Sequence, residues 1–379
     1  ALLSAFIPLS TDLYLPALPG MAENFQAPVS LMNMTLVVFF VFYAIGTLIL
    51  GPLSDKYGRK PILLIGLVVY IASSILCSMA NNVYYLILWR IFQAIGSGAA
   101  TAVSMAIIKD SFHGKERVSA LALVQSMIAV APVIAPMIGA QVLYFTTWRG
   151  VFWSLAVVGL ISFLGVLFLE ETIGERTEGN ILHSLSRLGV VLKNRAFTFL
   201  LIIFSLPNIA MMAYVSGSSY IYINGFGLSE QIYSYFFAAS ASLAVIGPFI
   251  YLQLAKFFKD KTIIVASFGC VSILGVLIYL MGNLSPWVFS ILIGFSTTAL
   301  SILRPPGTNL MFEQQQHDTG SVSSLISCGM TLMGSFGMII VSLDWANRIF
   351  VVGILLTFIA LLCLCLWILN KSIIKPARS

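Results

Sequence analysis

The chain passes from one long apolar run to the next through Gly51-Pro52-Leu53-Ser54-Asp55-Lys56-Tyr57-Gly58-Arg59-Lys60. This connector gathers four charges in a protein of which only 9% of the residues are charged. Gly51 allows two helices to approach closely, and Gly58 allows a sharp reversal of the backbone. Asp55 is placed to cap a neighbouring helix N-terminus or to pair with a cation. The three basic residues are typical of the cytoplasmic side of a membrane protein, so we predict a short cytoplasmic loop between two membrane spans.

The composition excludes most soluble classes of protein. Of 379 residues, 59% are hydrophobic, and the mean hydropathy is +0.99, which is more apolar surface than a soluble fold can bury. Nearly all apolar runs are long enough for membrane-spanning helices, which indicates a helical bundle rather than a β-barrel. The net charge of +6 is spread over the loops instead of forming a stripe, so we expect no nucleic-acid partner.

The cysteines and histidines indicate no metal site. All five cysteines lie inside apolar runs without metal-ligand or disulfide spacing, and all three histidines lie in loops. We therefore expect no cofactor and no bound metal. The chain begins inside an apolar run without a methionine, so we expect residues to precede Ala1 and do not interpret residues 1–20 as a signal peptide.

Hydropathy and helix breakers predict twelve membrane spans in the sequence. They cover about residues 1–19, 30–53, 61–80, 83–108, 118–145, 148–169, 196–223, 230–256, 261–282, 286–312, 319–342 and 346–370. The one long polar interval, 170–195, separates six spans from six, which predicts an N-terminal half over 1–169, a cytoplasmic linker and a C-terminal half over 196–379. Apolar residues at helical spacing predict that the linker forms an amphipathic helix on the membrane surface. These residues are Ile181, Leu182, Leu185, Leu188 and Val191.

The basic residues are distributed asymmetrically between the two sides of the membrane. Of 20 Lys and Arg, 16 lie in the loops, linker and C-terminal tail of one side, and only Arg149 and Arg348 lie on the other. This asymmetry places both termini and the linker in the cytoplasm. We therefore predict a multi-pass protein of the cell (cytoplasmic or inner) membrane, surrounded by membrane lipid and monomeric.

The spacing Gly-x-x-x-Asp-Lys-x-Gly-Arg-Lys between the second and third spans resembles the signature loop of the major facilitator superfamily. That resemblance implies an all-α integral membrane protein with twelve transmembrane helices in two pseudo-symmetric six-helix halves. It also implies that the loop latches the two halves on the cytoplasmic side during alternating access. A generic basic loop is the alternative. The basic segment 254–261, between the eighth and ninth spans, is interpreted as a decayed second copy of the loop.

Charged residues inside the predicted spans are candidates for function, because each is costly to hold in hydrocarbon. Asp12 lies about 10 Å below the outer end of the first span and Arg90 about 12 Å below that of the fourth, at 1.5 Å per residue. Their matching depth favours a shared wet cavity. The protonation of such a carboxylate depends on desolvation and on the nearby guanidinium. We therefore predict that Asp12 carries a proton and that Arg90 modulates it, with a buried structural ion pair as the alternative.

The tenth span contains Arg304 directly before Pro305-Pro306-Gly307, which must break or kink the helix. The Arg304 side chain can serve the structure, by snorkelling or by binding the freed carbonyls. It can also contact a substrate or an anion, and the sequence leaves both roles open.

Two further motifs resemble those of the superfamily. Arg90-Ile91-Phe92-Gln93-Ala94 is similar to its Arg-x-x-Gln-Gly motif, which is associated with proton coupling, with an alanine in place of the glycine. Segment 131–140 of the fifth span is similar to the antiporter motif Gly-Pro-x-x-Gly-Gly, which is implied to bend the helix and seal the proton path in exporters. Two of its fixed positions match and two glycines are replaced by alanine. The prolines and the glycine that carry this resemblance are Pro132, Pro136 and Gly139.

The first span carries Leu9-Ser10-Thr11-Asp12-Leu13-Tyr14-Leu15-Pro16-Ala17-Leu18-Pro19, which resembles the twelve-span drug:proton antiporters of the Bcr/CflA type. The likeness covers residues 8–170 and continues more thinly through 214–218 and 305–309. It implies a proton-coupled secondary active exporter of small lipophilic or amphipathic compounds, giving drug or multidrug resistance by efflux. A proton-coupled importer of a nutrient or metabolite on the same fold is the alternative.

The resemblance also implies that spans one, four, seven and ten line a central cavity, with two, five, eight and eleven beside them. Polar or aromatic residues at mid-depth on these spans are candidates for contact with a small-molecule substrate, although helix packing explains each one as well. The candidates are Tyr14, Tyr43, Gln93, Gln125, Asn208, Tyr214, Tyr222 and Arg304.

An intramembrane enzyme is the third class of protein that we consider. The sequence has no His-Glu-x-x-His, Gly-x-Ser-x-Gly or Walker motif and no paired acids in adjacent spans. We therefore expect a transporter driven by a proton gradient rather than an enzyme.

Overall fold

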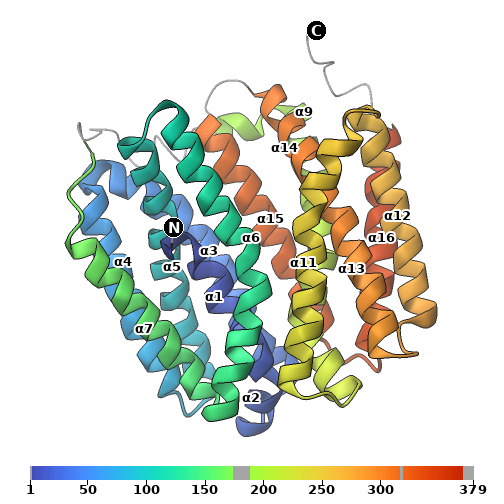
Figure 1. Ribbon diagram of the computed structural model, residues 1–379, viewed down its shortest axis with the longest axis horizontal. Coiled ribbons are helices and arrows are strands. Elements are labelled where there is room, and N and C mark those ends of the chain that lie inside the picture. Colours follow the sequence, from blue (N-terminus) through green and yellow to red (C-terminus); the bar gives the residue numbers. More distant parts are fainter. Residues whose placement is uncertain (1, 174–187, 316–318, 370–379) are drawn as a thin grey trace. The chain divides into compact units, whose positions relative to one another are not determined.

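The computed structural model describes residues 2–173, 188–315 and 319–369 (Figure 1). Within these ranges all regular secondary structure is helical, and twelve helical segments are long and apolar enough to cross a membrane. The predicted all-α membrane protein with twelve spans is therefore confirmed. The predicted linker helix lies mostly outside the described residues, and only its last part, 188–192, is seen as helix.

The chain forms two compact units, of which the first comprises Ala1–Ser184 and Ser229–Tyr235. Helix α5 packs against both α3 and α4, α4 packs against α7, and α1 packs against α6 (Figure 1). The helices of this unit are η1 (Leu2–Ala5), α1 (Phe6–Asp12), η2 (Leu15–Ala17), α2 (Leu18–Asn24), α3 (Val29–Tyr57), α4 (Arg59–Ser78), α5 (Val83–Ser111), α6 (Gly114–Phe145) and α7 (Trp148–Leu167).

The first span is a chain of short helices rather than the single helix that the hydropathy predicts. Helix α1 ends at Asp12, and η2 begins at Leu15 after two residues outside the helices. Three prolines explain this segmentation, because each lacks the N–H that an α-helix needs. They are Pro8, Pro16 and Pro19. The span therefore offers an interrupted backbone at the position of Asp12.

The second unit comprises Leu185–Leu228 and Phe236–Ser379, so α11 contributes residues to both units. Within it, α12 packs against α13 and α16, and α10 packs against α15. Its helices are α9 (Arg195–Ser205), α10 (Pro207–Ser219), the π-helical turn η3 (Tyr220–Gly225), α11 (Glu230–Leu254), α12 (Asp260–Met281), α13 (Pro286–Ile302), α14 (Arg304–Gln314), α15 (Thr319–Ser342) and α16 (Arg348–Leu369).

Two spans of the second unit are interrupted at prolines. The tenth span breaks at Leu303, between α13 and α14, as Pro305 and Pro306 predict. The seventh span breaks at Leu206, between α9 and α10, directly before Pro207. The sequence analysis did not predict this second break, although Pro207 marks it.

Small residues bring the helices of the first unit together. A Cβ at Gly46 of α3 would lie 3.3 Å from the Cα of Ile95, and a Cβ at Gly98 of α5 would lie 3.0 Å from the backbone nitrogen of Thr47. At Gly51 the nearest atom would be 3.9 Å away, which is ordinary van der Waals contact. The expected close approach at Gly51 is therefore wrong within this unit, because α3 meets α5 more tightly at Gly46.

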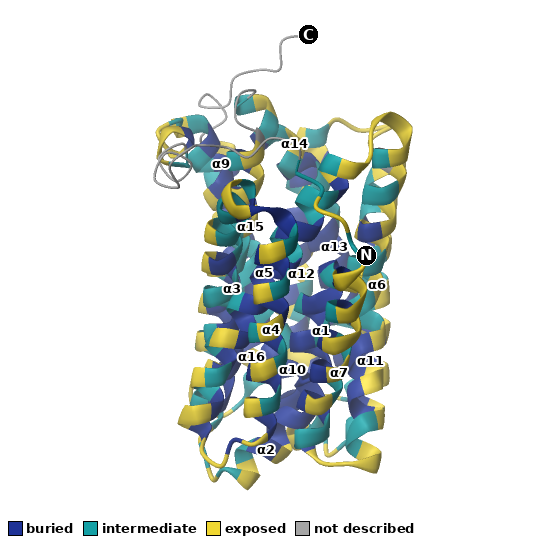
Figure 2. Cartoon of the chain, turned by 90° about the vertical axis from the view of Figure 1, so that its left-hand side faces the viewer, coloured by how far each residue is buried: buried dark blue, intermediate teal, exposed yellow. Residues whose placement is uncertain are grey.

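Large apolar side chains remain exposed along α4 and α7, where yellow positions recur in Figure 2. Helix α4 exposes Ile65 and Val68, and α7 exposes Trp153, Leu160 and Ile161. Water would make such surfaces costly, whereas lipid covers them without penalty. The exposed surface therefore agrees with a bundle that spans a membrane.

Candidate functional site

Asp12 lies at the interruption of the first span. It is the last residue of α1, and only 7% of its surface is exposed. The hydroxyl of Thr11 donates to Asp12 Oδ1 over 3.1 Å and also lies 2.9 Å from the carbonyl oxygen of Ile7. A carboxylate at such a position needs a proton or a cation to offset the cost of burial.

Arg90 of α5 is completely buried and holds three elements together. Its Nη1 donates to the carbonyl oxygen of Ser10 over 3.0 Å and to Gln93 Oε1 over 2.6 Å, and its Nε donates to the carbonyl oxygen of Thr35 over 3.3 Å. The guanidinium carbon also lies 4.3 Å from the ring centre of Phe39. The cation is thus neutralised by carbonyl dipoles and an aromatic face rather than by an acid.

Asp12 and Arg90 do not form a salt bridge. The two ion pairs found in the described part of the chain both belong to Arg59. The alternative of a buried structural ion pair is therefore wrong. Arg90 instead reaches the backbone of Ser10, two residues before Asp12 in the same helix. Arg90 therefore bears on Asp12 through the position of α1.

Two residues predicted to line a cavity belong to this network. Gln93 is fully buried, accepts from Arg90 and donates through Nε2 to Ser74 Oγ over 2.8 Å. Tyr14 is fully buried too, and its hydroxyl is hydrogen-bonded to Thr35 Oγ1 at 2.9 Å. Both side chains are therefore enclosed by protein in this structure.

Gly139 of the antiporter-like motif packs directly against the first span. A Cβ at this position would collide with the carbonyl oxygen of Leu13, the residue after Asp12. Helix α6 runs without interruption through Pro132 and Pro136, and Pro136 is buried while Pro132 is half-buried. Gly139 thus allows α6 to reach the backbone at the break beside Asp12.

The second unit repeats this contact with different chemistry. A Cβ at Gly337 of α15 would collide with the carbonyl oxygen of Ile209 in α10. Asn208 precedes Ile209 just as Asp12 precedes Leu13. The Nδ2 of Asn208 donates to the carbonyl oxygen of Met330 over 2.6 Å. The pseudo-symmetric counterpart of the buried acid is therefore a neutral amide.

A recess lies in the second unit where the two broken spans meet. It is small, with a volume of about 20 Å³, and is partly open. The exposed side chain of Arg304 reaches it, and its Nη2 donates to the sulfur of Met211 over 3.5 Å. The lining residues are Phe204, Pro207, Asn208, Met211, Leu300, Leu303, Arg304 and Met330. Two of the predicted cavity residues, Asn208 and Arg304, are thus brought together here.

The remaining predicted cavity residues do not join this recess. Tyr214 and Tyr222 are buried in an aromatic cluster of the second unit, with Tyr214 stacked on Phe237 at 6.0 Å and Tyr222 stacked on Phe236 at 5.3 Å between ring centres. In the first unit, Tyr43 is half-buried on α3 and Gln125 is exposed on α6.

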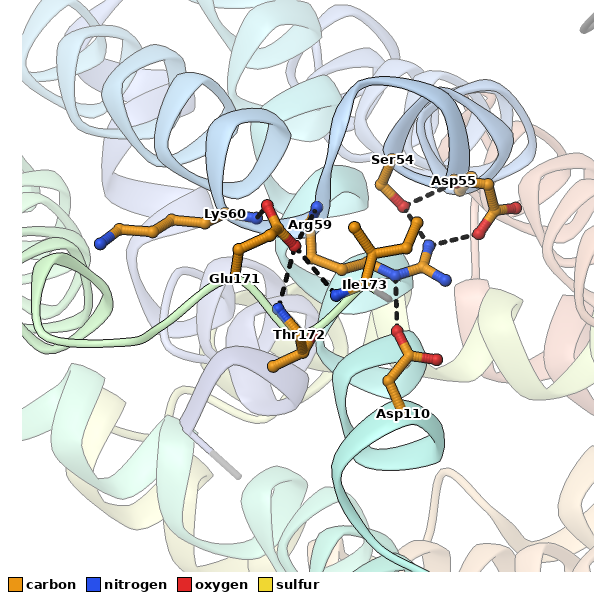
Figure 3. Close-up of polar contacts among 9 residues, drawn as sticks. Ser54, Asp55, Arg59, Lys60, Asp110, Glu171, Thr172 and Ile173 are labelled. Carbon is orange, nitrogen blue, oxygen red and sulfur yellow. Dashed lines mark hydrogen bonds and ion pairs between the residues drawn. The ribbon is translucent and has the colours of Figure 1, made fainter. Parts of the chain in front are cut away.

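The connector between α3 and α4 contains a compact polar network around Arg59 (Figure 3). Arg59 forms an ion pair with Asp55, and its Nε lies 2.9 Å from Asp110 Oδ2 at the end of α5. Its Nη1 also donates to Ser54 Oγ over 2.7 Å. Of the two roles expected for Asp55, the structure shows pairing with a cation. The network ties the end of α3 to the end of α5.

Glu171 supplies the helix cap that the sequence analysis considered for Asp55. Its carboxylate accepts from the backbone nitrogens of Arg59 over 2.9 Å and Lys60 over 3.2 Å, at the start of α4 (Figure 3). Gly58 adopts a φ of 106°, and a Cβ there would lie 2.6 Å from Glu171 Oε2. The backbone conformation therefore favours glycine, and a larger residue would also displace the capping carboxylate.

Hydrogen bonding also sets the charge of Glu171. Desolvation raises the pKa of this carboxyl, but backbone N–H donors outweigh that effect and bring the pKa below its ordinary value. The donors are the backbone N–H groups of Arg59, Ile173, Lys60 and Thr172. The capping group is thus held as a carboxylate at neutral pH, where it interacts favourably with the helix N-terminus.

Three members of the network were missed from the sequence: the role of Ser54, and Asp110 and Glu171 altogether. A signal existed, because Asp110 and Glu171 are acids at the ends of spans, on the same side as the basic loop. The two remaining loop cations point elsewhere: Lys60 Nζ donates to the carbonyl oxygen of Leu167 over 2.9 Å, and Lys56 Nζ lies 5.4 Å from the ring centre of Tyr57.

The family model of the Major Facilitator Superfamily matches residues 1–338, and this chain belongs to that superfamily. It is 32% identical over 337 residues to the uncharacterized MFS-type transporter YdgK of Bacillus subtilis (strain 168), covering 86% of this chain and 83% of that one. It is 27% identical over 293 residues to the multidrug resistance protein MdtL of Salmonella paratyphi A, covering 76% of this chain and 74% of MdtL.

Solved structures show the same fold at low sequence identity. A D-xylose-proton symporter matches with a TM-score of 0.72 at 15% identity, over 96% of this chain and 95% of the other. A bacterial homolog of the human lysosomal transporter Spinster, in an inward-facing and occupied conformation, matches with a TM-score of 0.75 at 14% identity, over 98% and 96% of the two chains. The protein is therefore a transporter of the major facilitator fold and not an enzyme.

Proposed function

We propose that this transporter is a proton-coupled exporter of small lipophilic or amphipathic compounds, of the Bcr/CflA type, in the cytoplasmic or inner membrane with both termini in the cytoplasm. The observation that carries the proposal is the buried Asp12 at the break of the first span, without a cationic partner and beside the carbonyl against which Gly139 packs. The multidrug resistance name of the MdtL relative supports export of drug-like compounds.

Asp12 is the group that exchanges the proton in this mechanism. A buried carboxylate without a cation is costly, so Asp12 has to be protonated while it is enclosed and can release the proton only when water reaches it. Protons entering down their gradient would thus be exchanged for substrate leaving the cell. Arg90 acts as a positioning residue in this scheme, because it binds the backbone of Ser10 and fixes the end of α1.

The Arg59 network provides the conformational element of the proposal. It joins α3, α4 and α5 through Asp55, Asp110 and Glu171. Rigid attachment of these three ends lets the first unit move as one body during alternating access. The predicted latch residues Gly51, Lys56 and Lys60 belong to the same connector.

The experiment uses purified protein in liposomes with an internal pH dye and an imposed proton gradient. We expect phenicols or other lipophilic compounds to drive proton movement with the wild type and not with Asp12→Asn. Glu23→Gln is the matched control, because Glu23 is an exposed acid of the same span, in α2. Equal proton movement in the wild type and Asp12→Asn would refute Asp12 as carrier. Proton-coupled uptake of a polar solute, without drug-dependent proton movement, would establish an importer instead.

A further inference from the structure

The recess at the broken spans contains Arg304, which has no acidic partner among the described residues. It lies where α9 gives way to α10 and α13 gives way to α14, so both walls carry an interruption. Transporters often form substrate sites at discontinuous helices, because the interrupted backbone there faces a cavity instead of lipid. The recess therefore combines two interrupted walls with an open side, and it lies entirely within the second unit.

Arg304 has no structural task that explains its presence in the recess. Its single hydrogen-bond partner among the described residues is the thioether of Met211, at 3.5 Å. It binds none of the backbone carbonyls that Pro305 and Pro306 leave without a donor, and none of the described acids pairs with it. A guanidinium carries five N–H donors, and thioether sulfur is a weak acceptor. Most of its donor capacity is thus available to a ligand.

The rest of the lining is apolar apart from one amide. Phe204, Met211, Leu300 and Met330 supply aromatic, aliphatic and thioether surface, which adapts to varied apolar groups. Asn208 donates to Met330, and its carbonyl oxygen has no partner among the described residues. A ligand with a compact acceptor group for Arg304 and an apolar body for the remaining wall would match this surface.

We propose that the recess binds amphipathic compounds that carry an anionic group, such as a carboxylate or a sulfonate, on an apolar body, with Arg304 as the residue that selects the anion. Planar oxyanions fit the fork of a guanidinium through paired, charge-assisted hydrogen bonds. Lipophilic cations are disfavoured by repulsion from the same group. This inference rests on the proposed export function and names the class of substrate that the recess of the second unit would bind.

Three dansyl compounds with the same aromatic body test the proposal. Dansyl glycine is an anion, dansyl amide is neutral and dansyl ethylenediamine is a cation at neutral pH. Their fluorescence rises in an apolar pocket, so Kd is measured at equilibrium with the full-length protein in nanodiscs and without a proton gradient. We expect wild type to bind the anion at least tenfold more tightly than the cation.

The variants assign the selection to Arg304. Arg304→Gln should weaken dansyl glycine about tenfold to hundredfold, as expected for loss of hydrogen bonds to a charged group, and should change dansyl amide by less than about threefold. Arg304→Lys keeps the charge and should restore part of the preference. Lys256→Gln is the control for net charge, because Lys256 is an exposed cation of the connector after α11.

Clear results would overturn the proposal. It fails if the wild type binds dansyl ethylenediamine as tightly as dansyl glycine. It also fails if Arg304→Gln leaves the Kd for dansyl glycine unchanged. Should Arg304→Gln not fold, Arg304→Lys takes its place, because a lysine keeps the charge but loses the paired hydrogen bonds. A Kd for dansyl glycine that is severalfold weaker, with the Kd for dansyl amide unchanged, supports the proposal, and an unchanged Kd for dansyl glycine refutes it. Binding of dansyl glycine to Asp12→Asn keeps the two proposals distinguishable, because it should persist even where proton-coupled transport is lost.

Discussion

Arg90 and Arg304 lie away from the ends of their membrane spans, one in each half of the protein, and the two side chains have opposite surroundings. Arg90 in the first unit is fully buried and donates to two backbone carbonyls and one amide. Arg304 in the second unit is exposed to a recess and donates to one thioether. The same residue type therefore serves as a structural clamp in one half and remains available to a ligand in the other.

The scaffolds around these arginines are nevertheless alike. In both units a glycine of one span packs against the carbonyl of a broken span: Gly139 against Leu13, and Gly337 against Ile209. The residue before that carbonyl is Asp12 in the first unit and Asn208 in the second. The halves thus repeat a backbone contact while dividing the chemistry, with the acid in one half and the available cation in the other.

The largest effect should come from removing the clamp. Arg90→Gln leaves the carbonyls of Ser10 and Thr35 buried without their donor, so we expect a loss of about 3 kcal/mol or more in the free energy of unfolding. Arg304→Gln removes an exposed side chain with one weak partner and should change stability by less than about 1 kcal/mol. Denaturant titration in detergent compares the two variants. Similar losses for both would contradict the difference between the two arginines.

A medium effect should follow from filling the repeated glycine contact. Gly139→Ala and Gly337→Ala each place a Cβ against a backbone carbonyl, which cannot move as a side chain can, so we expect each to cost about 1–3 kcal/mol. Gly269→Ala in α12 is the control, because nothing lies within 4 Å of a Cβ there. Thermal unfolding in detergent measures all three. If Gly139→Ala changed the stability no more than Gly269→Ala does, the close contact at Gly139 would not contribute to stability.

The twelve spans and their class were predictable because lipid imposes long apolar helices with internally satisfied backbones. The break before Arg304 was predictable too, because two prolines follow it. The recess was not, because the break at Leu206 lies in a span whose hydropathy looks continuous and the residues of the two breaks are about a hundred positions apart. Gln93 shows the opposite case. The sequence offers this polar residue at mid-depth as a substrate contact, but in the structure its hydrogen-bonding groups are occupied by Arg90 and Ser74.

The smallest effect concerns the connectors, which differ between the halves as the arginines do. In the first unit, Glu171 caps α4 through backbone N–H groups, whereas in the second unit Asp260 at the start of α12 accepts from the hydroxyl of Tyr251 over 3.0 Å. Glu171→Gln should cost a few tenths of a kcal/mol at neutral pH, because the carboxylate is exposed and screened. Asp260→Asn should cost no more.

The pH dependence of stability distinguishes a cap that acts through its charge from one that acts only as a neutral hydrogen-bond acceptor. Because the pKa of Glu171 lies below its ordinary value of 4.5 in the folded protein, its contribution is present above that value and is lost as the pH falls through the folded-state pKa. The stability difference between wild type and Glu171→Gln should therefore be constant from neutral pH to about pH 5 and shrink below about pH 4.5. Thermal unfolding of both proteins across this range measures it. A difference that did not change with pH would show that the charge of Glu171 contributes nothing, and the side chain would then act only as a hydrogen-bond acceptor for the start of α4.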